Sequence, residues 1–348
     1  MKKVLCTLFL TLILLPPVSA QLFSGDNVRL FPFVENGNWG FIDRDGNVVI
    51  TPAYSSVAAF SEGYAAVELK DGRMTLIDSK GRPQFEPMAA RIFPLSENLA
   101  RYSVEEKWGY LNPDGTIAIA PVYETASDFH SGVARVQKDR RFAFIDEKGV
   151  LLTKFYKHAY NFSEGLAIVE IDGKRGYIDV FDDLIIEPIF DDSDGFSQGL
   201  AAVRVGSKYG FIDKSGKFAI KADYDNARWF SDGLAPVAVD GLWGFVDQSG
   251  DMKIKPAFIR VGNFYEGLAA AFSNGAWGYI DKKGEFQIPP KFNDSGNFSL
   301  GVAAVENCEV AASGAKVCGL AYINQKGEII WDSLGDSSKD KKAVAKAQ

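Results

Sequence analysis

The sequence repeats itself over almost its whole length. A block of the form Trp/Tyr-Gly-aromatic-aliphatic-Asp/Asn occurs at residues 39–43, 108–112, 209–213, 243–247 and 277–281, and weaker copies begin at Met74, Phe142, Arg175 and Leu320. Successive copies start 35, 34, 34, 33, 34, 34, 34 and 43 residues apart. A second block, Phe-Ser-Glu-Gly followed by small residues, returns in step with the first from residue 60 to residue 298. A period of this length predicts small units that bury their apolar faces only against their neighbours.

Each unit has the pattern of three β-strands. In one copy, residues 200–205 and 209–213 form two strands around a short turn, and residues 217–221 form a third. The turn after the second strand begins with Asp or Asn and has Gly at its fourth position in eight of the nine copies: Gly46, Gly81, Gly115, Gly149, Gly216, Gly250, Gly284 and Gly327. This pattern is typical of a type I turn that ends in a left-handed residue.

The second strand is apolar on both faces. Trp243 and Phe245 point to one side of the sheet, and Gly244 and Val246 point to the other. A strand of this kind is covered on both sides. The first strand carries small residues such as Ala201, which allow a neighbouring sheet to approach closely. We therefore expect small twisted sheets stacked face to face.

The fold is predicted to be all-β, with about nine antiparallel meander units of about 34 residues. A closed, β-propeller-like ring is favoured, because the units around Trp39 and Ala321 are as apolar as the middle ones and neither end has a polar cap. Residues 155–163 or 191–196 then supply a short inner fourth strand. An open β-solenoid or superhelix is the alternative, since 34 residues is short for four strands and nine units is a high number.

The first twenty residues have the pattern of a signal peptide. Lys2 and Lys3 precede an apolar stretch at residues 4–15, and small residues end at Ala20. Cleavage after Ala20 leaves no transmembrane segment, because the stretch is shorter than the roughly 20 residues that a span needs. We expect an exported protein, periplasmic or secreted. It has a repeat domain at residues 21–332 and a disordered polar tail at residues 333–348.

Charge and cysteine content exclude several classes of ligand. After cleavage, 38 − 2 = 36 basic residues face 45 acidic ones, a net charge of −9. An acidic chain without a basic cluster in its repeats has no electrostatic footprint for nucleic acid. Cys308 and Cys318 are ten residues apart and are predicted to form a local disulfide. We expect no metal and no cofactor, because a cysteine metal site needs more ligands.

The chain offers little for catalysis. His130 and His158 have no metal-ligand spacing and no nucleophile motif beside them. The recurring Asp of each copy is interpreted as a turn former. The acids that break the repeat, Asp182-Asp183 and 191–194, are the candidates for a glycoside hydrolase, which needs two carboxylates. An acidic solvated loop is the favoured interpretation, and no catalytic residue is assigned.

The aromatic residues fall into two groups. Those at the recurring strand position are interpreted as core residues: Trp39, Trp108, Tyr209, Trp243 and Trp277. Trp229 and Trp331 lie outside that pattern and are the candidate binding residues. Their rings suit stacking on a sugar or a quaternary ammonium group.

The chain resembles the bacterial WG-repeat (KWG-repeat) proteins. The resemblance rests on residues 38–43 (NWGFID), 107–110 (KWGY) and 162–167 (FSEGLA), and it covers nearly all of the chain after residue 20. Met74-Thr75, Arg175-Gly176, Leu320-Ala321 and the cysteine segment depart from the pattern. The hairpin is also distantly similar to choline-binding cell-wall repeats. The family resemblance implies an interaction role without naming a ligand.

These observations favour a non-catalytic exported scaffold that binds a protein or glycan partner in the cell envelope or outside the cell. One alternative is a cell-wall or carbohydrate-binding module with aromatic pockets between repeats. A glycoside hydrolase is the other.

Overall fold

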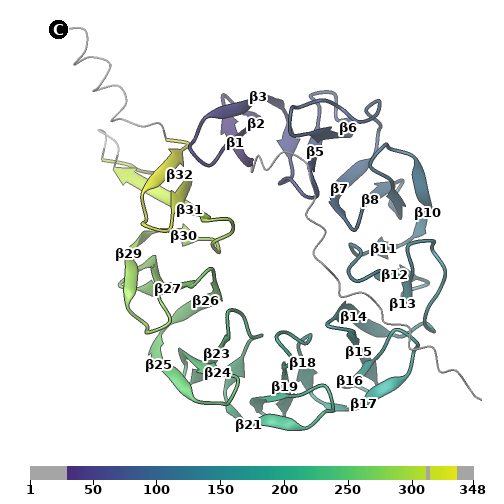
Figure 1. Ribbon diagram of the computed structural model, residues 1–348, viewed down its shortest axis with the longest axis vertical. Helices are drawn as coiled ribbons and strands as arrows, with labels where there is room; N and C mark the ends of the chain where they lie inside the picture. Colours follow the sequence, from purple (N-terminus) through teal and green to yellow (C-terminus); the bar gives the residue numbers. More distant parts are fainter. Residues whose placement is uncertain (1–29, 311–313, 335–348) are drawn as a thin grey trace, which may run out of the picture.

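The computed structural model describes residues 30–310 and 314–334, and these fold into nine small antiparallel sheets arranged in a ring (Figure 1). The chain is therefore a nine-bladed β-propeller, and the predicted closed ring is confirmed. We number the blades 1 to 9 in chain order, from the sheet β1-β2-β3 to the sheet β30-β31-β32-β33. No helix in the described residues is long and apolar enough to cross a membrane. The predicted signal peptide at 1–20 and the tail from residue 335 lie outside the described residues.

Each blade is a meander that runs from the axis to the rim (Figure 1). The inner strands are β4 (Ser56–Val57), β7 (Arg91–Ser96), β11 (Thr125–Ala126), β14 (His158–Ser163), β18 (Asp192–Ser193), β22 (Asn226–Ala227), β26 (Arg260–Tyr265) and β30 (Asp294–Ser295). The second strands are β1 (Phe31–Glu35), β5 (Tyr64–Glu68), β8 (Leu99–Val104), β12 (Ala134–Lys138), β15 (Leu166–Ile171), β19 (Ala201–Val205), β23 (Leu234–Val239), β27 (Leu268–Ser273) and β31 (Val302–Val310).

The third strands carry the Trp-Gly block and pair with the second strands. They are β2 (Asn38–Ile42), β6 (Met74–Asp78), β9 (Lys107–Leu111), β13 (Arg141–Ile145), β16 (Lys174–Ile178), β20 (Lys208–Ile212), β24 (Leu242–Asp247), β28 (Ala276–Ile280) and β32 (Lys316–Asn324). The outer strands are β3 (Val48–Tyr54), β10 (Ile117–Tyr123), β17 (Leu184–Phe190), β21 (Phe218–Tyr224), β25 (Met252–Phe258), β29 (Phe286–Phe292) and β33 (Ile329–Asp332). The three strands expected within 200–221 are found, and β14 and β18 are the inner strands expected at 155–163 and 191–196.

The glycine of the Trp-Gly block allows the outer strand to cross closely over the third strand. A Cβ atom at Gly244 would lie 2.4 Å from the carbonyl oxygen of Ile254, and one at Gly40 would lie 2.4 Å from that of Ile50. The register between these strands also shifts, because Trp243 pairs with Phe258 while Phe245 pairs with Ile254. The outer strand therefore bulges over the glycine, where no side chain fits.

Blades with and without this glycine differ in their outer strand. The six blades that have it, at Gly40, Gly109, Gly176, Gly210, Gly244 and Gly278, each have a seven-residue outer strand. Thr75, Ala143 and Ala321 replace it in blades 2, 4 and 9. In the described residues, blades 2 and 4 keep only isolated bridges there, and blade 9 has the four-residue β33. Arg175 replaces the Trp of the block in blade 5, but Gly176 keeps the glycine. Blade 5 accordingly has a regular outer strand of seven residues.

The blades are held together by nine apolar cores, one for each pair of neighbours around the ring. Each core joins two adjacent sheets; Phe245 of blade 7, for example, packs with Val261 and Phe264 of blade 8. In seven of the interfaces an aromatic ring two residues after the Trp position contacts the Phe of the next Phe-Ser-Glu-Gly block. The ring centroids are 4.7–5.0 Å apart. Such contacts stabilise beyond the area that they bury.

The Phe-Ser-Glu-Gly block also carries hydrogen bonds from blade to blade. Ser61, Ser96, Ser163, Ser197 and Ser231 each donate to the carbonyl oxygen of the corresponding aromatic or leucine one repeat later, at 2.5–2.7 Å. The carboxylate of Glu62 accepts from the backbone N–H groups of Glu97 and Asn98 at 2.7 and 2.8 Å. The recurring polar residues are thus occupied in holding the ring together.

The ring closes by packing of blade 9 against blade 1. Phe33 and Ile42 of blade 1 are buried against Val302 and Tyr322 of blade 9. The Tyr322 hydroxyl donates to the carbonyl oxygen of Pro32 at 2.8 Å. The described residues at this interface meet face to face without exchanging a strand.

The recurring aspartates form the predicted turns. The Asp213 carboxylate accepts from the backbone N–H groups of Ser215 and Lys217 at 2.8 and 3.2 Å, and Gly216 is left-handed with φ +80°. Asp182, the one residue that replaces this glycine, takes the same conformation with φ +69°. The side chain of Ser215 lowers the pKa of Asp213, that of Asn47 lowers the pKa of Asp43, and that of Lys253 lowers the pKa of Asp247.

Replacing Gly244 by Ala is expected to destabilise the protein by about 1–3 kcal/mol, because the outer strand must move away from the new methyl group. Ala143→Gly, at the same position of a blade with no regular outer strand, is the matched control. It should cost less than about 1 kcal/mol. Urea unfolding followed by circular dichroism measures both. Equal losses in the two variants would contradict the role assigned to the glycine.

Acid should weaken the turns. Because the folded pKa values of Asp43, Asp213 and Asp247 lie below the unfolded value of about 3.9, their contribution is complete above that pH and is lost as the pH falls further. The triple Asp→Asn variant keeps turn formers that the chain itself uses at Asn112 and Asn324. We expect its Tm to lie below that of the wild type near neutral pH, and the difference to narrow steadily as the pH falls from about 4 to about 2. A constant difference over this range would argue against the assignment.

Candidate functional site

An open groove of about 1150 Å³ lies between blades 2 and 3 and reaches the first residues of blade 4. It is lined by residues 56–58, Ala66, Glu68, Gly72, Met74, 89–94, 103–108 and Glu124. The lining includes the β5–β6 and β8–β9 turns and the inner strand β7, so the groove opens toward the end of the ring that carries the hairpin turns between second and third strands.

Blade 2 has Met74 at the Trp position, where its neighbour blade 3 has Trp108. Ala66 pairs with Leu76 in blade 2, and the same register position holds an arginine in blades 3 and 4 and an alanine in blades 6, 8 and 9. Leu76 and Leu95 also replace the aromatic pair of the regular interfaces.

Arginines join neighbouring blades at several interfaces. Arg101 donates to the carbonyl oxygen of Ala126 at 3.3 Å, and its side chain contacts the Asp128 carboxylate at 2.6 Å. Equivalent inner-strand carbonyls accept from Arg135, Arg175 and Arg228 at 2.6–2.9 Å. The guanidinium of Arg228 lies 4.4 Å from the centroid of the Trp243 ring. A cation anchored to the next blade therefore covers the aromatic ring.

The groove has an apolar part near its centre. The rings of Phe93 and Trp108 lie 5.3 Å apart at 43° to one another, and both residues are half-buried. Arg101 lies over Phe93 at 4.1 Å. Tyr102 belongs to the same apolar core as the groove-lining Ala66, Met74 and Val104 and is 2% exposed. Its hydroxyl has no hydrogen-bond partner among the described residues, and burial raises its pKa.

The rim carries charges of both signs. Glu68 accepts a hydrogen bond from Ser56 at 2.7 Å, and Glu124 accepts from the backbone N–H groups of Asp139 and Arg140. The other charged side chains are exposed and make no ion pair or side-chain hydrogen bond with the described part of the chain. These are Arg91, Glu105, Glu106 and Lys107.

The aromatics at the Trp position are less buried than the core interpretation implies. Trp39, Trp108, Tyr209, Trp243 and Trp277 are all half-buried, and the fully buried rings stand two residues later, at Phe41, Tyr110, Phe211, Phe245 and Tyr279. The Trp position lies one residue into its strand, beside the hairpin turn, so that solvent reaches one side. The later position lies within the interface between blades.

The two candidate binding residues lie elsewhere. Trp229 is 43% exposed and its carbonyl oxygen accepts from the Asn263 side chain at 2.7 Å. Trp331 packs at the closing interface, with ring centroids 5.8 Å from Phe33 and 5.9 Å from Tyr322. Neither lines the groove. The sequence signal for the groove was the departure at Met74-Thr75, which by itself did not point to a site.

The acids that break the repeat are engaged by basic or hydroxyl groups. Asp182 accepts from the Tyr156 hydroxyl and faces Lys154, Asp191 pairs with Lys174, and Asp192 pairs with Arg175. Burial raises the pKa of Asp194, and the neighbouring carboxylate of Asp192 adds to the rise. His130 and His158 are both exposed.

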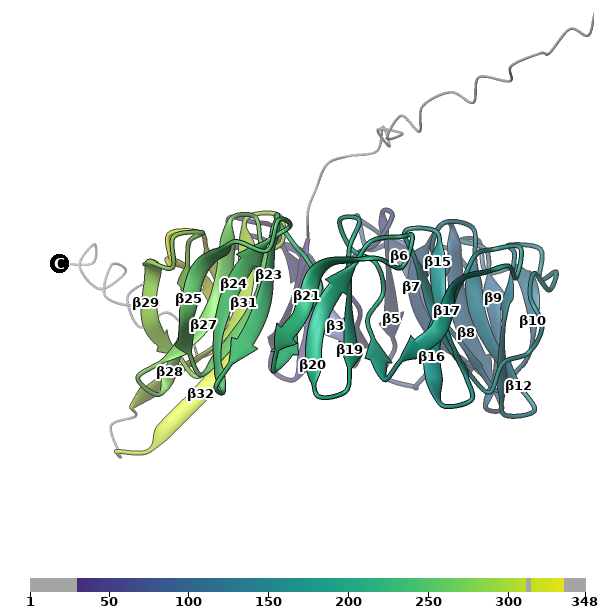
Figure 2. The ribbon, with the colours of Figure 1, turned by 90° about the horizontal axis from the view of Figure 1, so that it is seen from below.

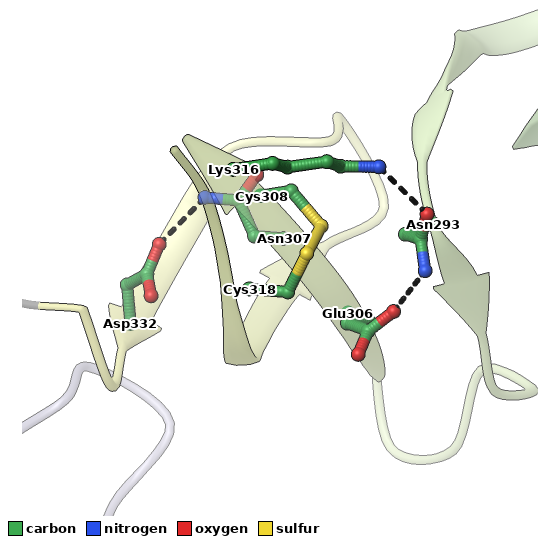
Figure 3. Close-up of a disulfide and its surroundings, with 7 residues drawn as sticks. All are labelled: Asn293, Glu306, Asn307, Cys308, Lys316, Cys318 and Asp332. Atoms are coloured by element: carbon green, nitrogen blue, oxygen red, sulfur yellow. Dashed lines mark hydrogen bonds between the residues drawn. A yellow bond between two sulfur atoms is a disulfide. The ribbon is translucent and has the colours of Figure 1, made fainter. Parts of the chain in front are cut away.

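Cys308 and Cys318 are directly opposite one another in β31 and β32 and are joined by a disulfide (Figure 3). Asn307 donates to Asp332 at 2.6 Å and Lys316 to Asn293 at 3.0 Å, which ties the hairpin to β33 and to the residue that precedes β30. The hairpin projects beyond the ring (Figure 2). Glu306 and both sulfur atoms lie within 4.8 Å of one another, but sulfurs bonded to each other offer no thiolate to a metal.

Comparison with known proteins identifies the repeat. No curated protein sequence matches the chain significantly. Its fold is similar to a crystal structure of a eukaryotic initiation factor, with a TM-score of 0.63 and 11% identity over 89% of this chain and 96% of that one. A crystal structure of Citrobacter koseri AztD shares 12% identity over 87% of this chain and 93% of that one, with a TM-score of 0.42. The similarity to the initiation factor, at 11% identity, concerns the fold and not the function.

The family model of the WG-containing repeat matches residues 39–73, 108–141, 142–174, 176–209, 209–243, 243–275 and 277–307. Residues 74–107, which supply much of the groove, fall in the gap between the first two matches. With seven matches spread over most of the ring, the chain belongs to the WG-repeat family.

Proposed function

We propose that this protein is a non-catalytic, exported β-propeller scaffold that binds a protein or glycan partner, in the cell envelope or outside the cell, through the groove between blades 2 and 3. The observation that carries the proposal is the coincidence of a departure from the repeat with an open groove. Residues 74–107 depart from the repeat and line an open groove with unpaired charges and half-buried aromatic rings. Concave sites of this composition are the usual places for ligands.

Two features support a binding role over a catalytic one. The recurring serines and acids of the Phe-Ser-Glu-Gly blocks stabilise the ring, and the turn aspartates bind their own backbone. A glycoside hydrolase needs one acid held protonated beside a free carboxylate. The irregular acids Asp182, Asp191 and Asp192 face cations. Burial raises the pKa of Asp194, but the carboxylate beside it, that of Asp192, is paired with Arg175. The pattern of residues 1–20 supports export.

The purified chain without residues 1–20 should pellet with isolated bacterial envelope fractions in a saturable manner, and excess unlabelled protein should compete. Sacculi and membrane-protein fractions are tested separately, because they distinguish a glycan from a protein partner. The same incubations should release no soluble sugar, which is measured as reducing ends. Absence of saturable binding to both fractions would overturn the binding role, and sugar release that grows with time would overturn the non-catalytic assignment.

A further inference from the structure

The groove between blades 2 and 3 combines an apolar platform with polar groups of both kinds. Phe93 and Trp108 are tilted against one another at 5.3 Å and stay half-buried, and Met74 and Pro94 extend the apolar lining. Aromatic faces of this sort pack against the C–H face of a sugar ring, which is apolar on its axial side and polar at its edge.

The charged side chains around this platform include both hydrogen-bond donors and acceptors, which suits the hydroxyl groups of a sugar. Arg91 and Lys107 are donors, and Glu105 and Glu106 are acceptors; none of them has a side-chain partner among the described residues. A ligand of one charge would meet repulsion from half of these groups. A sugar hydroxyl both donates and accepts, so that it suits donors and acceptors placed side by side.

A buried hydroxyl below the groove points in the same direction. Tyr102 is 2% exposed and its hydroxyl lacks a partner in the described part of the chain. It shares a core with Ala66, Met74 and Val104, which line the groove. Buried polar groups are rarely left unpaired. Tyr102 does not itself line the groove, so a water placed between its hydroxyl and the ligand would satisfy this group.

Addition of a peptide strand is the other way in which an edge such as β7 binds a ligand. Pro94 lies within β7 and has no N–H group to donate. The register of β7 also shifts between Ile92 and Leu95. Both features interrupt the regular backbone pattern that an added strand requires.

We infer that this groove binds a glycan, with a pyranose ring on Phe93 and Trp108 and its hydroxyls on Arg91, Lys107, Glu105 and Glu106. The inference rests on the proposed binding function and names its ligand class. Arg101 lies 4.1 Å from the centroid of the Phe93 ring and 5.4 Å from that of Trp108, so the sugar packs on the part of these rings that the guanidinium leaves uncovered. Met74, in place of a Trp, borders the same groove in blade 2.

The test is titration of the purified chain with defined soluble glycans: chitooligosaccharides, peptide-free glycan strands from sacculi, and neutral hexose oligomers. Met74→Trp places in the groove the side chain that the repeat uses elsewhere. It should weaken binding of the best glycan at least about tenfold. The matched control, Phe142→Trp, introduces a Trp at the same repeat position of blade 4, outside the groove. This variant should bind the glycan as the wild type does. Thermal unfolding should show both variants folded.

A second variant keeps the inference testable if Met74→Trp does not fold. Glu105→Gln with Glu106→Gln alters only exposed side chains and should weaken glycan binding several-fold without changing the Tm. Glycan binding that is equal in all variants would overturn the groove as the site. If the wild type binds no glycan yet still pellets saturably with membrane proteins, the glycan inference fails and the binding function stands. Binding only of fragments that carry peptide would also overturn the glycan assignment.

Discussion

The structure depends on a sheet that is apolar on both faces and too small to cover either of them. A three- or four-stranded blade buries Phe245 on one face and Val246 on the other only when it lies between two neighbours. Closure extends this condition to every blade, because the last blade meets the first. The aromatic pairs, the serine hydrogen bonds and the carboxylate contacts all act at the interfaces that this constraint creates.

The repeat period, the turn chemistry and the two-sided strand were sufficient to predict the architecture. They predicted the ring, the strands within 200–221 and the left-handed glycines. The role of the Trp-Gly glycine was not predictable, because it depends on how the outer strand returns over the third strand. The partial exposure of Trp243 was not predictable either, for a different reason. The distance of this residue from the hairpin turn decides how much solvent reaches its ring.

The candidate site was harder to predict than the fold. Blade 2 has Met74 at the Trp position, and a methionine carries no chemical signal of its own. The residues that face it, such as Arg91 and Phe93, come from the inner strand of the next blade, and only the packing of the two sheets brings them together. Trp229 and Trp331 stood out in the sequence because they break the pattern, yet one lies away from the groove and the other packs at the closing interface.

The interface between blades 9 and 1 differs from the other eight because it joins the first and last blades of the ring. In the described residues its core has four fully buried side chains, and five half-buried ones pack against them: Phe31, Ala304, Leu320, Ile330 and Trp331. Fully buried side chains resist local opening more than half-buried ones do. An opening of the ring at this junction would leave the groove intact, because the groove lies between blades 2 and 3.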